Sequence, residues 1–196
     1  MHADHFLDLI PLRYAIRYGS KRRKERLPLW MPPGGIAMLR AMTKVFTGEG
    51  SGDFLDEAFE IKEFDPEKPL PLGEGQLRFA STTHFITSFA MRYERNGTSI
   101  TYSADTAPDQ RVVELARGTD LFLCEATLLA DEEEPGGVRG HSSSKEAAKM
   151  AADAGAKRLV LTHYSQDATS ADLADGARSS YNGNIEIADD HTIIVI

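Results

Sequence analysis

The stretch His2-Ala3-Asp4-His5 places two histidines and an aspartate within four residues. Imidazole nitrogen and carboxylate oxygen are the ligands that zinc takes in catalytic sites, which leave one position for water. Further along the chain, side chains of the same kinds lie where predicted strands end, namely His84, Asp105 and His163. A lone histidine is a weak signal, but several candidates at strand ends together predict a metal site.

The hydrophobic pattern predicts strands that alternate with helices. Asn96-Gly97 predicts the tight turn of a hairpin. This mixture predicts an α/β sandwich, with sheets in the middle and helices outside. One predicted helix is opened by Pro32 to Gly35 and runs to about Phe46. The other predicted helices are 5–18, 109–116, 143–154 and 171–179. The predicted strands are 27–31, 59–64, 76–81, 88–95, 98–103, 121–125, 158–162, 185–187 and 192–196.

Composition limits the possible partners. The 196 residues are 41% hydrophobic and can bury a sizeable core, so we expect a single domain over residues 1–196. The formal net charge of −8 argues against a general nucleic-acid binder, which would use positive charge to displace counterions. The segment Arg13 to Arg26 is a local exception with seven basic residues. It is either a solvated surface or a region that steers an anionic substrate.

The single cysteine, Cys124, excludes an internal disulfide framework and fits a reducing cytosol. It follows the apolar run Leu121-Phe122-Leu123, which predicts a buried and unreactive thiol. The sequence has no apolar run long enough to span a membrane and no leader-like segment. We therefore expect a cytoplasmic protein without a membrane partner.

Six motifs taken together resemble the metallo-β-lactamase superfamily, and they cover nearly the whole chain in the same order. Within that superfamily they are most similar to the ribonuclease Z-like, cyclic-nucleotide phosphodiesterase-like branch. The motifs are His2-Ala3-Asp4-His5, His84, Ser103-Ala104-Asp105-Thr106, Cys124-Glu125-Ala126-Thr127, Gly140-His141-Ser142-Ser143 and Leu161-Thr162-His163.

The resemblance implies the αββα sandwich of this superfamily, which would here lack its N-terminal strands. Members begin their first motif, HxHxDH, with a histidine two residues before the position of His2, and they place several strands before it. We therefore expect the chain to be incomplete at its N-terminus, within that motif.

The resemblance also implies two divalent metal ions, with zinc ahead of manganese or iron. Its metal ligands map onto six positions. One ion would be held by His2, His84 and Asp105, and the other by Asp4, His5 and His163, with Asp105 bridging.

Three residues would carry catalytic roles. By the same resemblance, Asp4 would also orient or deprotonate the attacking water. His141 would stabilise the leaving oxygen, and Glu125 would accept the other ring proton of His141 and fix its tautomer. The alternative for His141 is a residue that merely ends a loop. His191 matches no motif, so we expect it on the surface.

The implied activity is hydrolysis of a phosphodiester by a hydroxide shared between two metals. Transfer-RNA-processing members carry a long arm between the two motifs that His84 and Asp105 match, whereas 20 residues separate them here. A cyclic nucleotide or another small phosphodiester therefore ranks above RNA 3′-end processing. The alternatives are a hydrolase of another ester, thioester or lactone on the same fold, and an inactive metal-poor fragment or interaction module. A homodimer could form through a sheet edge or the helix after Asp4.

Overall fold

The computed structural model of the chain describes residues 2–47, 54–129 and 139–196, without the side chains of Ala3, Asp4 and Phe46. The chain forms two compact units, Met1–Asp65 and Pro66–Ile196. Whether these two units belong to the single domain expected over residues 1–196 stays a prediction.

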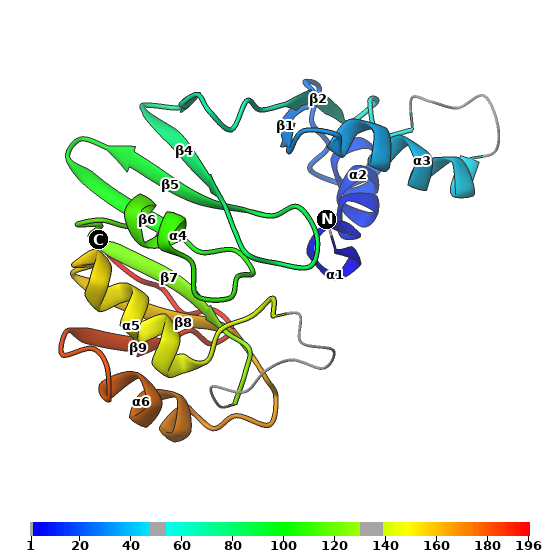
Figure 1. Cartoon of the computed structure of the whole chain (residues 1–196). Coiled ribbons are helices and arrows are strands. Elements are labelled where there is room, and N and C mark those ends of the chain that lie inside the picture. Colours follow the sequence, from blue (N-terminus) through cyan, green and yellow to red (C-terminus); the bar gives the residue numbers. More distant parts are fainter. Residues whose placement is uncertain (1, 48–53, 130–138) are drawn as a thin grey trace. The chain divides into compact units, whose positions relative to one another are not determined.

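The first unit combines short helices with a small parallel sheet (Figure 1). Strands β1 and β2 pair in parallel, and α3 connects them along the chain. Ile16, Leu39 and Phe59 are buried in a core to which both helices and strands contribute. The elements are α1 (Ala3–Phe6), α2 (Leu9–Tyr18), β1 (Leu27–Met31), α3 (Gly35–Thr47) and β2 (Phe59–Glu63).

The single helix predicted over residues 5–18 is wrong, because the structure has two helices there. The first ends at Phe6 and the second begins at Leu9. Pro11 lies in the first turn of α2, where its missing N–H is not needed. In one continuous helix the ring of Pro11 would clash with the carbonyl of Leu7, so the chain breaks between the two helices. The predicted end at Gly19 is confirmed, and its N–H donates to the Ala15 carbonyl at 3.1 Å.

The basic segment from Arg13 to Arg26 contains two kinds of side chain. Arg13 is 5% exposed, donates to the Phe54 carbonyl at 2.7 Å and pairs with Glu57 at 2.5 Å. The four residues from Lys21 to Lys24 are exposed. The segment is therefore only partly a solvated surface, since Arg13 is part of the buried structure.

The second unit is built on a seven-stranded sheet whose strands follow chain order (Figure 1). The first three pairings are antiparallel and the last three, from β6 to β9, are parallel. Parallel strands bring their carboxyl ends to the same edge of a sheet. The elements are β3 (Leu70–Leu72), β4 (Gly75–Ser81), β5 (Phe89–Arg95), β6 (Thr98–Tyr102), α4 (Gln110–Leu115), β7 (Leu121–Ala126), α5 (Ser144–Ala154), β8 (Arg158–Tyr164), α6 (Ser170–Arg178) and β9 (Asn184–Ile187).

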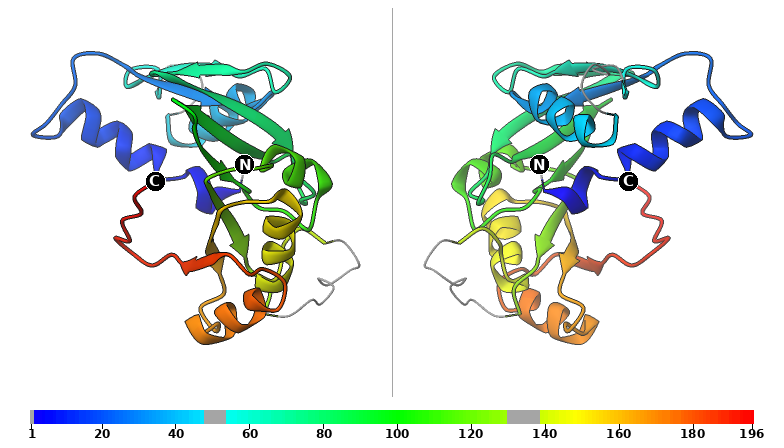
Figure 2. Two further views of the ribbon diagram at one scale, coloured as in Figure 1. Left: turned by 90° about the vertical axis from the view of Figure 1, so that its left-hand side faces the viewer. Right: turned by 90° about the vertical axis from the view of Figure 1, so that its right-hand side faces the viewer.

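Helices α4, α5 and α6 of this unit pack on the sheet, which Figure 2 shows from two further sides. Alternate residues of β7, including Phe122 and Cys124, join Ala147 and Leu173 of the helices in one core. The burial predicted for Cys124 is confirmed, with no exposed surface. Burial raises the pKa of this thiol above its ordinary value, so Cys124 stays protonated and unreactive.

The hairpin predicted at Asn96-Gly97 is confirmed between β5 and β6. Both residues have positive φ, 51° and 81°, as a type I′ turn requires. The helix predicted over residues 143–154 is also confirmed, and Ser143 and Glu146 form a reciprocal capping box at its start. Gly155 ends this helix in the left-handed conformation.

One strand prediction is wrong, and one strand of the structure was not predicted. Within the described range 139–196, residues 192–196 join no strand, and Ile193 is 88% exposed. The β-branched composition of this segment favours a strand, but a strand also needs a hydrogen-bonding partner. Conversely, β3 forms between Pro69 and Gly73 although prolines argue against strands. It lies at the edge of the sheet, where a missing N–H is tolerated. None of the described helices has the length and apolar character needed to cross a bilayer.

Candidate metal centre

Three of the predicted ligands come together at strand ends of the second unit. The Nε2 atom of His84 lies 3.7 Å from one carboxylate oxygen of Asp105. The Nε2 atom of His163 lies 3.9 Å from the other oxygen of the same carboxylate. Asp105 is 5% exposed and comes three residues after the end of β6. One carboxylate therefore faces two imidazoles, one through each oxygen.

Backbone and hydroxyl contacts hold the loop that carries His84. The Thr82 hydroxyl donates to the Asp105 carbonyl at 2.9 Å, and the Ala107 N–H donates to the Thr83 carbonyl at 2.8 Å. The Nδ1 atom of His84 lies 2.8 Å from the Gly140 carbonyl oxygen. Since a carbonyl only accepts, Nδ1 carries the proton, and Nε2 keeps a lone pair on the side of Asp105.

A bulge in the sheet sets the direction of His163. Glu125 of β7 pairs with Thr162 of β8, whereas the next residue, Ala126, pairs with Tyr164. His163 is thus the extra residue of the bulge and has a φ of 49°. Bulges often turn a side chain toward a functional site. Here the bulge brings the imidazole next to Asp105.

Thr127 links His163 to a buried acid. Its hydroxyl oxygen lies 2.7 Å from Glu125 Oε2 and 2.8 Å from His163 Nδ1. A hydroxyl has one proton, so when it donates to the carboxylate it accepts from the Nδ1–H of the imidazole. The Nε2 atom of His163 is then the nitrogen with a lone pair, as in His84.

Glu125 is fully buried and accepts hydrogen bonds on both oxygens. Oε1 accepts from the Thr106 N–H at 2.6 Å and from His141 Nδ1 at 2.9 Å. Oε2 accepts from the Ser142 N–H at 3.3 Å as well as from the Thr127 hydroxyl. The carboxylate therefore joins three segments of this unit around the histidines: its own strand end with Thr127, the loop of Thr106, and His141 with Ser142.

Glu125, His141 and His163 each offer one ligand atom within 4.8 Å of the others. This spacing could hold an ion, but both oxygens of Glu125 already accept from backbone N–H groups. Nδ1 of His141 is likewise occupied by the same carboxylate. We interpret this triad as a hydrogen-bonded support and not as a metal site.

His141 completes a cluster of three imidazoles. Its ring centroid lies 5.0 Å from that of His84 in an edge-on arrangement and 5.8 Å from that of His163 in a stacked one. The side chain of His141 is 14% exposed, so it can reach a bound molecule. Since Nδ1 faces Glu125, a contact with a bound molecule would be made through Nε2.

The donor atoms fit divalent metal ions. Zinc binds imidazole nitrogen and carboxylate oxygen at about 2 Å each. Donor atoms 3.7 and 3.9 Å apart therefore leave room for an ion between each pair. Metal-binding histidines normally engage their other nitrogen in a hydrogen bond, as His84 and His163 do.

Tyr102 lies at the end of β6 near these groups. Burial, followed by the negative charges of Asp105 and Glu125, raises the pKa of Tyr102 to about 12. The phenol is therefore neutral over the physiological range and does not supply an anion to this cluster.

The remaining predicted ligands belong to the first unit. His2 directly precedes α1, and Asp4 and His5 lie within it. His5 is exposed, and the side chain of Asp4 lies outside the described part of the structure. Their roles as ligands stay predictions. His191 is exposed, as predicted.

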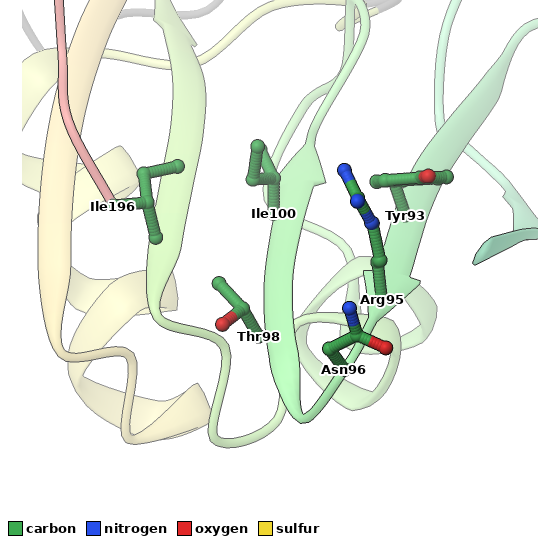
Figure 3. Close-up of a pocket in the computed structure, with 6 residues that line it drawn as sticks. All are labelled: Tyr93, Arg95, Asn96, Thr98, Ile100 and Ile196. Atoms are coloured by element: carbon green, nitrogen blue, oxygen red, sulfur yellow. The ribbon is translucent and has the colours of Figure 1, made fainter. Parts of the chain in front are cut away.

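A separate hollow of about 280 Å³ lies at the end of the β5–β6 hairpin (Figure 3). Its six described lining residues include neither histidine nor a carboxylate side chain, and its cation, Arg95, pairs with Glu74. The hollow therefore offers no set of metal ligands. Figure 3 shows Ile196 at the same hollow as Tyr93 and Ile100.

Sequence reasoning missed two supporting groups. Thr127 was predicted only as part of the motif Cys124-Glu125-Ala126-Thr127, although the Thr127 hydroxyl joins Glu125 to His163. It also missed the Gly140 carbonyl as the partner of His84. Thr127 lies two residues after an acid at a strand end, and this position could have indicated its role beside the histidines. The Gly140 contact depends on a fold that brings residues 56 positions apart together.

Comparison with known proteins identifies relatives. Residues 1–164 match the family described as Beta-lactamase superfamily domain. The chain is 32% identical over 186 residues to the uncharacterized protein Rv1339 of Mycobacterium tuberculosis, and this match covers 94% of the chain and 67% of that protein. It is 46% identical over 71 residues to a ribonuclease Z of Methanothermobacter thermautotrophicus, covering 36% and 23% of the two proteins.

The fold agrees with these matches. The chain is 28% identical over 189 residues to the probable metallo-hydrolase YhfI of Bacillus subtilis, covering 95% of the chain and 72% of YhfI. The crystal structure of YhfI superposes with a TM-score of 0.80, covering 95% of this chain and 71% of that one. The predicted α/β fold of metallo-β-lactamase type is thereby confirmed, and the family implies divalent metal ions. This chain belongs to the metallo-β-lactamase superfamily, in its ribonuclease Z-like branch of metallo-hydrolases.

Proposed function

We propose that this chain is a metal-dependent phosphodiesterase that acts on a cyclic nucleotide or another small phosphodiester. The observation that carries the proposal is the Glu125–His141 pair, which lies beside metal-ligand candidates. Phosphodiester hydrolysis needs an activated water and a group that stabilises the leaving oxygen. The cluster of His84, Asp105 and His163 serves the first need, and His141 serves the second.

In this proposal two divalent ions bind, with zinc ahead of manganese or iron. When bound, such ions supply Lewis acidity and a water molecule of lowered pKa. Support comes from His84 and His163, whose Nδ1 atoms are engaged and whose Nε2 atoms lie near Asp105. The roles predicted for His2, Asp4 and His5 remain part of the proposal, including water orientation by Asp4.

His141 donates a proton to the leaving oxygen in the proposed reaction. Its Nδ1–H donates to Glu125 Oε1 at 2.9 Å, so the proton available for transfer is at Nε2. The buried carboxylate stabilises the doubly protonated ring, because an opposite charge favours the charged form. Glu125 is thus a positioning residue, and the Thr106 and Ser142 N–H groups hold it in place.

The test is hydrolysis of bis(p-nitrophenyl) phosphate and cyclic nucleotides, together with metal content. We expect divalent metal in the purified chain and turnover of these substrates. His141→Ala should lower kcat by a factor on the order of 10² to 10⁴ and leave the metal content unchanged. The exposed His191→Asn is the control, because asparagine tolerates the left-handed φ of 66° at this position. Turnover by His141→Ala at the wild-type rate would contradict the proposed role.

RNA 3′-end processing is the second candidate, because 71 residues of the chain are 46% identical to a ribonuclease Z. The net charge of −8 and the 20 residues between His84 and Asp105 favour the smaller substrate. A precursor RNA assayed beside a cyclic nucleotide separates the two, and faster RNA cleavage would reverse this order. Bound metal with turnover only of an ester, thioester or lactone would indicate a different hydrolase. A chain with neither metal nor turnover would be the inactive module.

A further inference from the structure

Phe85 is an exposed aromatic side chain beside the histidine cluster. It directly follows His84 and is 46% exposed. Its ring centroid lies 5.1 Å from that of His84 and 5.9 Å from that of His141. Apolar groups that border a few convergent polar groups are typical of ligand sites, so this exposed ring is a candidate binding surface.

Gly140 leaves room for the Phe85 ring. A Cβ added at Gly140 would lie 2.6, 2.8 and 2.9 Å from three ring atoms of Phe85, closer than real contacts allow. Only glycine therefore lets the ring lie against the backbone at this point. The carbonyl of the same glycine accepts from His84 Nδ1 at 2.8 Å. One residue thus makes room for the aromatic ring and holds the candidate metal ligand.

A ring that packs beside two imidazoles and is still exposed offers a flat apolar surface to a ligand. A neutral ring does not attract a phosphate, but it stacks well on another planar aromatic group. Nucleobases stack on aromatic side chains with little dependence on sequence, because every base has a π face. Ile86, which is 36% exposed, extends the apolar surface next to it.

We propose that Phe85 is a specificity-determining residue that stacks on the nucleobase of the substrate while the phosphate lies at the histidine cluster. This inference rests on the proposed phosphodiesterase function and narrows its substrate to nucleotides. The competing explanation is that Phe85 only shields the rings of His84 and His141 from water.

Binding provides the first test. Adenosine 5′-monophosphate and ribose 5-phosphate share the sugar and the phosphate and differ in the base. By calorimetry, the chain should bind the nucleotide about tenfold more tightly than the sugar phosphate. Phe85→Leu should bring the ratio of the two affinities close to one, whereas Phe85→Trp should keep it. Leu72→Val, at a side chain that is also 46% exposed, is the matched control and should also keep it.

Kinetics provides the second test. Adenosine 2′,3′-cyclic phosphate and glycerol 1,2-cyclic phosphate contain the same five-membered cyclic phosphodiester, with and without a base. Phe85→Leu should raise KM for the nucleotide about tenfold more than KM for the glycerol ester. A thermal melt of each variant separates this effect from misfolding.

Different outcomes contradict the two proposals. Equal losses for ligands with and without a base, or equal affinity of the wild type for both, would overturn the stacking role and leave Phe85 as a shield. Failure of the wild type to hydrolyse any phosphodiester would instead contradict the proposed function. In that case the ratio of binding affinities still decides whether Phe85 recognises a base.

Discussion

The histidines of the second unit and those of the first are held in different ways. His84 and His163 have their Nδ1 atoms bonded to Gly140 and Thr127, and the side chain of His84 is 1% exposed. His5 belongs to a helix of only four residues and is exposed, and His2 directly precedes that helix. A helix this short is marginal on its own, because few hydrogen bonds offset the ordering of its backbone.

The comparison shows that a motif predicts which side chains are present but not how firmly they are held. The sequence contains both groups of histidines in equally clear motifs. In the second group, the Gly140 carbonyl holds His84, and Thr127, itself bonded to buried Glu125, holds His163 before any ligand binds.

The largest effect is expected for Glu125→Gln. Both oxygens of Glu125 face donors, so an amide NH₂ group would meet a donor in either orientation. The free energy of unfolding should fall by about 3 kcal/mol, measured by urea unfolding. The exposed Glu114→Gln serves as control and should change it little. Equal stability of the Glu125 variant and the wild type would mean that the network is not what holds the second group.

Thr127→Val removes the hydroxyl that joins Glu125 to His163 and keeps the shape of the side chain. We expect a loss of about 1.5 kcal/mol in unfolding free energy. Metal affinity should fall by a factor of about 10 to 100, because His163 loses the partner of its Nδ1 atom. Metal titration measures this, with the exposed Thr98→Val as control. Unchanged affinity would show that the orientation of His163 does not depend on Thr127.

Asp109 caps α4 and accepts from the hydroxyl of Thr83, the neighbour of His84. Asp109→Ala should lower the unfolding free energy by about 1 kcal/mol, and Asp109→Asn by less, because asparagine also caps helices. Burial alone would raise the pKa of Asp109, but the hydrogen bonds and charge of Arg111, with the Thr83 hydroxyl, hold that pKa below its ordinary value of 3.8.

The lowered pKa of Asp109 sets the pH dependence of this effect. An acid of this kind stabilises the fold above its unfolded pKa of 3.8 and loses that contribution as the pH falls through its lower folded pKa. The difference in stability between the wild type and Asp109→Asn should therefore shrink in acid. Urea unfolding at neutral pH and below a pH of about 4 measures it. A difference that grows in acid would be inconsistent with a lowered pKa.

The smallest effect on stability is expected for His5→Ala. An exposed substitution outside the buried core changes the unfolding free energy by less than about 0.5 kcal/mol. Thermal unfolding of this variant, next to that of Glu125→Gln, compares the two groups directly. A loss above about 1 kcal/mol would mean that α1 is held as firmly as the strand ends, and the contrast would no longer stand.

Local signals in the sequence predicted much of the fold. Asn96-Gly97 specified a hairpin because its φ angles match a turn that few other residue pairs adopt. Ser143 specified the start of α5 because its hydroxyl replaces a missing backbone partner. Placing His84, Asp105 and His163 at strand ends was enough to predict their proximity, and the distances confirm it.

Other features depend on contacts that the sequence does not display. Residues 192–196 have the composition of a strand, but among the described residues none pairs with them in a ladder. Pro11 indicates a break in the chain before α2, but the apolar residues on both sides of that break have the spacing of one continuous helix. The hydrogen bonds of Thr127 and Gly140 join segments far apart in sequence, so only the folded chain shows them.

The bulge at His163 also affects how this residue should be removed in the laboratory. A left-handed φ disfavours most side chains, and histidine tolerates it better than alanine or a β-branched residue. Alanine scanning at this position would mix the loss of an imidazole with new backbone strain. Glycine would relieve the backbone strain and remove the imidazole ring. We therefore expect the glycine variant to unfold at a higher temperature than the wild type and to lack activity. This combination is typical of a stability–function trade-off, in which a protein holds a strained residue in place for its chemistry.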